Sequence, residues 1–276
     1  MGVNTISTGE IYPFYLDKVK YQQYAELIAT INLWKGFIMN NLRSFIAFIF
    51  TALLTANAWA AGGSVTGTIK FDGAIPKFKE IKMDADPICS AQHKDAVFPQ
   101  TLFLGDGQTM GNIFVHVKNA PAGNYPAPTE PLVVDQKGCN YDPHVIGVMV
   151  GQPVKILNPD GTLHNVHAIA KVNQEFNMAM PKFRTEVSKT FDKPEFMFAI
   201  KCDVHPWMSA WVSVMPGPFF AVTKADGKFE IKGLPAGSYQ IEAWHEKLGT
   251  KTASVTVTDG AAATADFTFA APTPKQ

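Results

Sequence analysis

The sequence predicts an all-β protein made of β-sandwiches, and three observations support this. From Ser64 onward, short segments rich in β-branched and aromatic residues follow one another at strand-like spacing. Turn signals separate them, among them the Asp-Gly pairs that begin at Asp72, Asp160 and Asp226. Few stretches are long or periodic enough for an amphipathic helix. Many short strands divided by frequent turns are typical of sandwiches.

Each predicted strand is a run of β-branched and aromatic residues that is bounded by a turn or loop. Asp160-Gly161 divides 153–158 from 164–170, and an Asp-Gly turn at Asp226 joins two alternating strands. Residues 171–190 are expected to form a long loop. The predicted strands, in chain order, are 65–71, 112–119, 131–135, 145–151, 153–158, 164–170, 195–201, 210–216, 228–233, 238–244 and 251–258.

Clusters of Pro and Gly place domain boundaries near Pro131 and Pro216. The alternative to three separate parts is that the N-terminal segment completes the C-terminal sandwich, with the middle domain inserted between them. The expected parts are an N-terminal β segment at 61–130, a ligand-bearing β-sandwich at 131–215, a second small β-sandwich at 216–270 and a tail at 271–276.

Residues 39–60 have the architecture of a secretory signal peptide. Arg43 supplies the positive start, an apolar core follows, and Ala58-x-Ala60 offers the small residues that a signal peptidase requires. The apolar core is shorter than the roughly 20 residues that cross a bilayer, and an uncleaved anchor is the alternative. We expect a periplasmic or secreted protein with no membrane span after cleavage. Residues 1–38, which precede an internal Met, are expected to be a mis-assigned upstream extension.

Charge and motifs argue against several classes of function. Lys plus Arg and Asp plus Glu number 24 each, so the chain lacks the basic excess on which nucleic-acid binding depends. The sequence contains no Gly-rich phosphate loop, no HExxH and no GxSxG. His245 has no nucleophile or acid partner in its neighbourhood and is expected at the surface. We therefore expect a protein that is not an enzyme.

Two short pieces of sequence carry potential metal ligands. Residues 163–167 read LHNVH and residues 202–208 read CDVHPWM. A thiolate, imidazoles and a thioether are ligands that suit copper, and in sites with two His and one Cys a Met sulfur approaches weakly along the axis. The spacing of Cys, His and Met within seven residues fits a loop between two strands. These pieces therefore predict one copper site.

Strand geometry assigns the ligands within these pieces. His164 and His167 are three residues apart and face opposite sides of a strand, so only one of them can point at the ion. We assign His164, with His167 packed or exposed elsewhere. Asn165 is either a turn residue or a tie between the His164 strand and the ligand loop that also hydrogen-bonds the sulfur. The predicted ligands are His164, Cys202, His205 and Met208.

The middle of the chain resembles the cupredoxins, the type 1 blue copper proteins, and within them the amicyanin- and plastocyanin-like members. The resemblance runs from about Leu132 to Val214 and rests on PLVVD, PVKILN, HNVH, the loop CDVHPWM and the strand AWVSV. It implies a Greek-key β-sandwich with one type 1 copper on the four residues assigned above. It also implies single-electron exchange with a redox protein such as a c-type cytochrome or a periplasmic dehydrogenase.

The C-terminal part resembles a second family. The sequence TKADGKFEIKGLPAGSYQIEAW within 216–270 is similar to carboxypeptidase-regulatory-like, or transthyretin-like, domains. That resemblance implies a small β-sandwich, which we expect to act as a binding or anchoring module.

The chain has three Cys, and the count leaves two of them once Cys202 is assigned to copper. In an oxidising compartment Cys89 and Cys139 are then expected to form a disulfide. The alternative is a second metal site built from Cys89, His93, Cys139 and His144, whose spacings are also ligand-like.

These inferences predict an exported blue-copper electron carrier. Because Pro206 and Trp207 follow His205, the ring edge of this His is expected to emerge through an apolar patch where a redox partner docks. Glu195 and Asp203 are candidates for tuning the potential. The alternatives are a periplasmic copper store or chaperone and a structural β-sandwich binding module.

Overall fold

The computed structural model describes Thr30 and residues 62–271. The signal peptide expected at 39–60 and the tail at 272–276 lie outside the described residues, as does the upstream extension apart from Thr30. Residues 62–271 belong to one compact unit of the chain, Trp59–Gln276. None of the helices among the described residues is long and apolar enough to cross a membrane.

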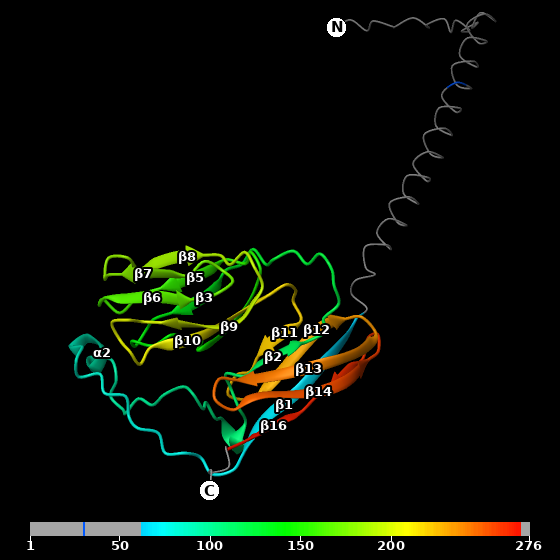
Figure 1. The fold of residues 1–276 in the computed structure, drawn as a ribbon, viewed down its shortest axis with the longest axis horizontal. Coiled ribbons are helices and arrows are strands. Elements are labelled where there is room, and N and C mark those ends of the chain that lie inside the picture. The colour runs from blue at the N-terminus through cyan, green and yellow to red at the C-terminus, as the bar shows by residue number, and fades with distance from the viewer. Residues whose placement is uncertain (1–29, 31–61, 272–276) are drawn as a thin grey trace, which may run out of the picture. The chain divides into compact units, whose positions relative to one another are not determined.

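The regular secondary structure of the described residues is almost entirely β, which confirms the predicted fold class (Figure 1). The helical elements among them are α2 (Pro87–Ala91) and the short 3-10 turn η1 (Asp106–Gln108). The strands are β1 (Gly63–Asp72), β2 (Phe114–Val117), β3 (Leu132–Asp135), β4 (Val145–Met149), β5 (Val154–Leu157), β6 (His164–Ile169), β7 (Phe176–Met180), β8 (Glu186–Lys189), β9 (Glu195–Lys201), β10 (Ser209–Met215), β11 (Phe220–Val222), β12 (Lys228–Leu234), β13 (Gly237–His245), β14 (Gly249–Val257), β15 (Ala262–Thr264) and β16 (Phe267–Ala270).

A first sandwich is built from β3 to β10. One sheet has the order β4-β10-β9-β6-β7 and the other the order β3-β5-β8. The chain crosses between the sheets, since β4 lies in one, β5 in the other and β6 in the first again. Alternate residues of β5 are buried, as expected for a strand with one face on a core. Ile146, Ile156, Val166 and Val212 from both sheets lie in one buried cluster.

A second sandwich joins strands from both ends of the described chain. β1 pairs antiparallel with β12 and parallel with β15 and β16. β2 lies between β11 and β13 in the other sheet, with β14 at its edge. Val65, Val115, Ile231 and Ile241 contribute to one buried cluster. The N-terminal strands therefore share a core with the C-terminal ones, the arrangement named above as the alternative.

Part of the stretch between β1 and β2 packs in the core of the first sandwich. Its Met83 and Cys89 are buried among residues of the first sandwich. Asp86 caps α2 by accepting hydrogen bonds from the backbone of Ile88 and Cys89 at 2.8 and 3.3 Å. The ends of residues 81–97 meet in a hydrogen bond of 2.8 Å from the Ile81 N–H to the Val97 carbonyl. We call residues 81–97 the cover segment.

Several contacts join the sandwiches. Gly147 of β4 faces Phe114 and Phe220, and a Cβ at this position would lie 2.8 and 2.6 Å from their rings, so only glycine admits the close approach. Nearby, His144 Nε2 lies 2.6 Å from the Glu246 carboxylate, and both side chains are buried. The first sandwich is therefore held against the second by buried contacts.

Candidate metal centre

Strand pairing brings the two predicted ligand pieces together. β6 pairs antiparallel with β9, and His167 lies opposite Lys201. Three residues back along β6 is His164, which the same register brings level with the residues that follow Lys201. The loop from Cys202 to Met208 connects β9 to β10. The fold therefore places His164 beside the loop that carries the other predicted ligands.

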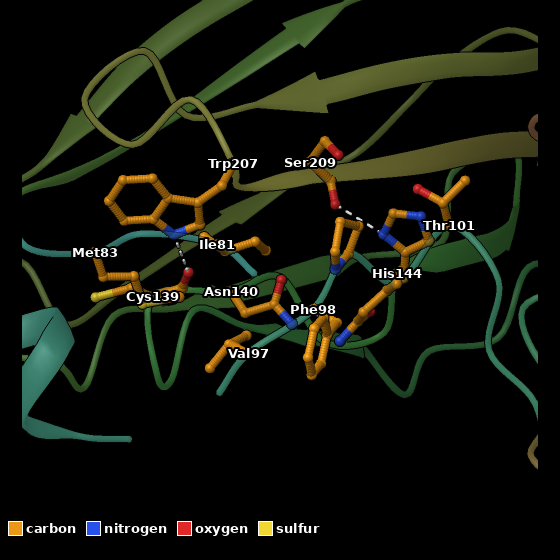
Figure 2. A pocket seen from close by; sticks show the side chains of 12 residues that line it. Ile81, Met83, Val97, Phe98, Thr101, Cys139, Asn140, His144, Trp207 and Ser209 are labelled. Carbon is orange, nitrogen blue, oxygen red and sulfur yellow. Dashed lines mark hydrogen bonds between the residues drawn. The ribbon is translucent and has the colours of Figure 1, made fainter. Parts of the chain in front are cut away.

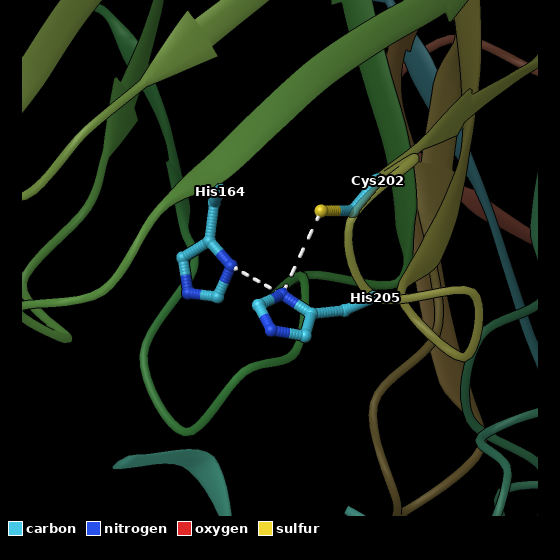
Figure 3. A group of neighbouring side chains, drawn as sticks. All are labelled: His164, Cys202 and His205. Atoms are coloured by element: carbon cyan, nitrogen blue, oxygen red, sulfur yellow. Dashed lines mark hydrogen bonds between the residues drawn. The ribbon is translucent and has the colours of Figure 1, made fainter. Parts of the chain in front are cut away.

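Three of the predicted ligands converge in a buried site. The Nδ1 atoms of His164 and His205 are 2.9 Å apart, and Cys202 Sγ is 3.8 Å from His205 Nδ1 (Figure 3). The three residues are at most 2% exposed, and their ligand atoms lie within 4.8 Å of one another. Metal–nitrogen and metal–sulfur bonds of about 2.0 and 2.3 Å span such separations.

Each histidine is held by a carboxylate at its outer nitrogen. His164 Nε2 lies 3.0 Å from Asp160 Oδ2, and His205 Nε2 lies 3.0 Å from Asp86 Oδ2. An ionised carboxylate only accepts hydrogen bonds, so both Nε2 atoms donate. In the neutral rings this leaves the Nδ1 lone pairs facing each other. Two lone pairs at 2.9 Å require a proton or another cation between them, and this arrangement fits a metal ion.

The pKa of His164 agrees with this reading. Burial opposes protonation, but hydrogen bonds with Asp160 and Cys202 outweigh it and raise the pKa to about 9. Burial also opposes ionisation of the Cys202 thiol, yet hydrogen bonds with His164 and the loop backbone lower its pKa below the ordinary value. The surroundings of His164 and Cys202 therefore favour a positive charge on the imidazole beside a thiolate.

Asn165 connects β6 to the ligand loop. Its Oδ1 accepts hydrogen bonds from the backbone N–H groups of Asp203 and Val204 at 2.7 and 3.3 Å. The same oxygen lies 3.3 Å from Cys202 Sγ. One side chain thus fixes the start of the loop and contacts the sulfur. This limits the freedom of the thiol relative to β6.

Met208 closes the ligand loop through its backbone. Its N–H donates to the His205 carbonyl at 2.9 Å, and its carbonyl accepts from the Cys202 N–H at 3.2 Å. The side chain is fully buried in the first core. Axial ligation by the Met208 sulfur stays a prediction.

The expected exposure of the His205 ring edge is wrong. The side chain is only 3% exposed. The cover segment lies over it, with Asp86 at hydrogen-bond distance and Cys89 Sγ 3.6 Å from Nε2. Sequence neighbours such as Pro206 and Trp207 could not predict this, because the covering residues lie more than a hundred positions upstream.

Other polar residues have roles that the sequence assigned only in part. His167 is partly exposed between Asp203 and Glu175, outside the three converging residues.

The expectation that His245 lies at the surface is wrong, because it is 3% exposed and its Nδ1 accepts from the N–H groups that follow it. Glu195 stands at the start of β9, away from Cys202, and binds the backbone of the β6–β7 turn.

Cys89 and Cys139 form a disulfide with a Cα–Cα distance of 5.6 Å. Both cysteines of the alternative second metal site are in this bond, so neither offers a thiolate to a metal ion. His93 Nε2 instead lies 2.8 Å from the Gly138 carbonyl. His144 contacts the Ser209 carbonyl and Glu246. The disulfide therefore attaches the cover segment to the first sandwich directly above the histidines.

A small pocket lies beside the disulfide (Figure 2). Its volume is about 40 Å³, enough for one or two water molecules. Trp207 lines it and donates from Nε1 to the Cys139 carbonyl at 3.0 Å. The Trp207 ring lies 5.0 Å from the His205 ring, centroid to centroid. Trp207 thus bridges His205 and the pocket.

Asp86 and Asp160 are site residues that the sequence did not reveal as such. In the sequence, Asp160 indicates only a turn. Its position four residues before His164, with Gly161 at φ +72° between them, is a signal that could have identified it. Asp86 carries no such signal, because it meets His205 only through the tertiary fold.

Comparisons with known proteins give two kinds of match. Residues 209–270 match the carboxypeptidase regulatory-like domain. That range covers β10, the last strand of the first sandwich, and β11 to β16 of the second. No curated protein matches the chain.

The structural neighbours include amicyanin and other cupredoxins. A Cu(I) form of amicyanin matches with 26% identity over 37% of this chain and 98% of its own, at a TM-score of 0.29. A purple cupredoxin from Nitrosopumilus maritimus matches with 20% identity over 30% of this chain and 99% of its own, at 0.26. A copper-containing nitrite reductase from Thermus scotoductus SA-01 matches with 21% identity over 35% of this chain and a quarter of the reductase, at 0.29. TM-scores this low support no functional argument.

Proposed function

We propose that His164, Cys202 and His205 hold one copper ion and that the protein carries single electrons in the periplasm or outside the cell. The observation that carries this proposal is the convergence of two imidazole Nδ1 atoms and one thiol in a buried site. Their outer nitrogens are tied to carboxylates, which leaves the inner lone pairs for a cation.

The donor atoms favour copper. One thiolate with two imidazoles suits an ion that is both soft and stable in two oxidation states, and we propose that the Met208 thioether would be a fourth, weaker ligand. Bound copper would supply a one-electron couple. The lowered pKa of Cys202 supports this choice, because the thiolate is the form that binds metal.

Rigid support favours electron transfer over storage or delivery. The ligands sit on a strand and on a loop fixed by Asn165, and the backbone of Met208 closes that loop. Burial and fixed hydrogen bonds limit rearrangement when an electron arrives or leaves. A store or chaperone must release its ion, for which exposed ligands are better suited. The redox partner we propose is a c-type cytochrome or a periplasmic dehydrogenase.

Redox titration of the copper-loaded full chain tests the carrier role. We expect one copper per chain and a reversible one-electron couple, with electrons exchanged with a soluble c-type cytochrome. The control is the His164→Ala variant, which should lose stoichiometric binding, beside His167→Ala, which should keep it. Stoichiometric copper without a reversible couple would support the storage alternative instead.

A further inference from the structure

The two histidines of the site are supported in the same way from opposite sides. Each Nε2 meets a carboxylate oxygen at 3.0 Å, Asp160 for His164 and Asp86 for His205. The two carboxylates come from distant parts of the chain. Asp160 follows β5 in the first sandwich, whereas Asp86 belongs to the cover segment.

Both carboxylates are fixed by further hydrogen bonds. The Asp160 side chain is 1% exposed and accepts from the backbone of Gly138 and Cys139 at 2.9 and 2.8 Å. Asp86 accepts from the backbone of α2 through Oδ1 and from Thr162 Oγ1 through Oδ2 at 2.9 Å. These donors stabilise the charged forms, so each carboxylate is held ionised and aimed at its ring.

The disulfide connects the segment that holds Asp86 to the segment that holds Asp160 in place. The Cys139 N–H donates to Asp160, and the Cys89 N–H donates to Asp86 at 3.3 Å. The bond between these cysteines therefore links the carboxylate behind one histidine to the carboxylate behind the other. The two histidines, their two aspartates and the disulfide are thus connected to one another, and the connection passes through the cover segment.

We infer that Asp86 and Asp160 are positioning residues of the copper centre, which present the two Nδ1 atoms to the ion and favour Cu(II) over Cu(I). This inference rests on the proposed function. A carboxylate behind a ligating imidazole fixes the tautomer and raises the basicity of the inner nitrogen. Two negative charges near the ion, of which Asp160 is buried and Asp86 partly buried, also stabilise its more highly charged state through Coulomb attraction.

Asp86→Asn is the most informative variant. Asparagine is a good helix N-cap, so its Oδ1 can keep the hydrogen bonds to α2. Its amide nitrogen replaces Oδ2 and donates, so it cannot accept from His205 Nε2. The change thus removes the charge and the acceptor while keeping the shape. Asp84→Asn, an exposed aspartate on the same segment, is the matched control.

The first measurement is the affinity for Cu(II) and Cu(I) together with the reduction potential of the bound copper. We expect Asp86→Asn to lower Cu(II) affinity by 10- to 100-fold, as loss of such partners typically does. Cu(I) affinity should change less. Each tenfold loss that is specific to Cu(II) raises the potential by about 59 mV for a one-electron couple. Asp84→Asn should leave both quantities unchanged. A folded Asp86→Asn variant with wild-type affinity and potential would overturn the inference.

The second measurement is made without copper. It tests the positioning role of Asp86 independently of the proposed function. In the metal-free full chain, ¹⁵N NMR of the imidazoles should show His205 protonated at Nε2, and Asp86→Asn should shift it toward the other tautomer. If wild-type protein binds no copper, the proposed function fails while this readout still decides the positioning role. An unchanged His205 tautomer in Asp86→Asn would overturn it.

Discussion

The imidazole of His144 and the carboxylate of Glu246 meet at 2.6 Å between the two sandwiches. Trp211 donates to the second carboxylate oxygen at 3.2 Å, so Glu246 receives bonds from two residues of the first sandwich. Burial opposes ionisation of Glu246, but the hydrogen bonds with His144 and Trp211 and the nearby positive charges together keep the carboxyl pKa below its ordinary value. A buried ionised acid of this kind is costly unless its partners remain.

Glu246→Gln should therefore weaken the association of the two sandwiches. We expect the free energy of unfolding to fall by about 1–3 kcal/mol, the range for a buried polar group that loses a partner. Urea unfolding at neutral pH measures this. Glu230→Gln, at an exposed glutamate of β12, is the control and should change little. Equal effects of the two variants would mean that the His144–Glu246 contact does not stabilise the fold.

Glu195 should make stability depend on pH. Burial raises its pKa, but hydrogen bonds from the backbone of Asn173 and Lys171 lower it by more. Because the folded pKa lies below the unfolded one, the contribution is complete above about pH 4.5 and is lost as pH falls through the folded value. Glu195→Ala should cost about 1–3 kcal/mol at pH 7 and progressively less in acid. A difference that is independent of pH would contradict this.

Removal of the disulfide should loosen the cover segment. The bond closes a stretch of 50 residues, so the double variant Cys89→Ser/Cys139→Ser should lose up to about 4 kcal/mol of stability. His205 should also become accessible to diethyl pyrocarbonate in the metal-free protein, as mapped by mass spectrometry. His164, which keeps Asp160, should react less. Unchanged protection of His205 would show that the segment stays in place without the bond.

Loss of the Asn165 side chain should disturb the thiol without removing a ligand. In Asn165→Ala the N–H groups of Asp203 and Val204 lose their acceptor, at a cost of about 1–3 kcal/mol. We expect copper still to bind, with a broader distribution of EPR parameters because the loop is less constrained. An EPR spectrum as narrow as that of wild type would assign the rigidity of the loop to other contacts.

The strands and three converging ligands could be predicted because their signals are local. Alternation and turn residues mark the strands, and Cys202 and His205 lie three residues apart in one loop. β7 and β8 were missed, since residues 171–190 carry many polar side chains and were expected to form a loop. β15 and β16 are short and depend on pairing with β1, which the local sequence does not reveal.

The cover over His205 could not be predicted because it depends on tertiary contacts. Asp86 and Cys89 lie at the site because the chain leaves β1 in the second sandwich and crosses to the first. The burial of His245 has the same origin, since its ring lies against Phe269 of the last strand. Sequence identified the chemistry of the ligands, whereas the fold determined their exposure and their carboxylate partners.

The most direct test of the central claim is the visible and EPR spectrum of the full chain loaded with Cu(II), beside Cys202→Ser. We predict an intense thiolate-to-Cu(II) absorption band with one copper per chain, absent in Cys202→Ser and retained in His167→Ala. Absence of the band in the wild-type protein, or its survival in Cys202→Ser, would contradict a copper centre built on His164, Cys202 and His205.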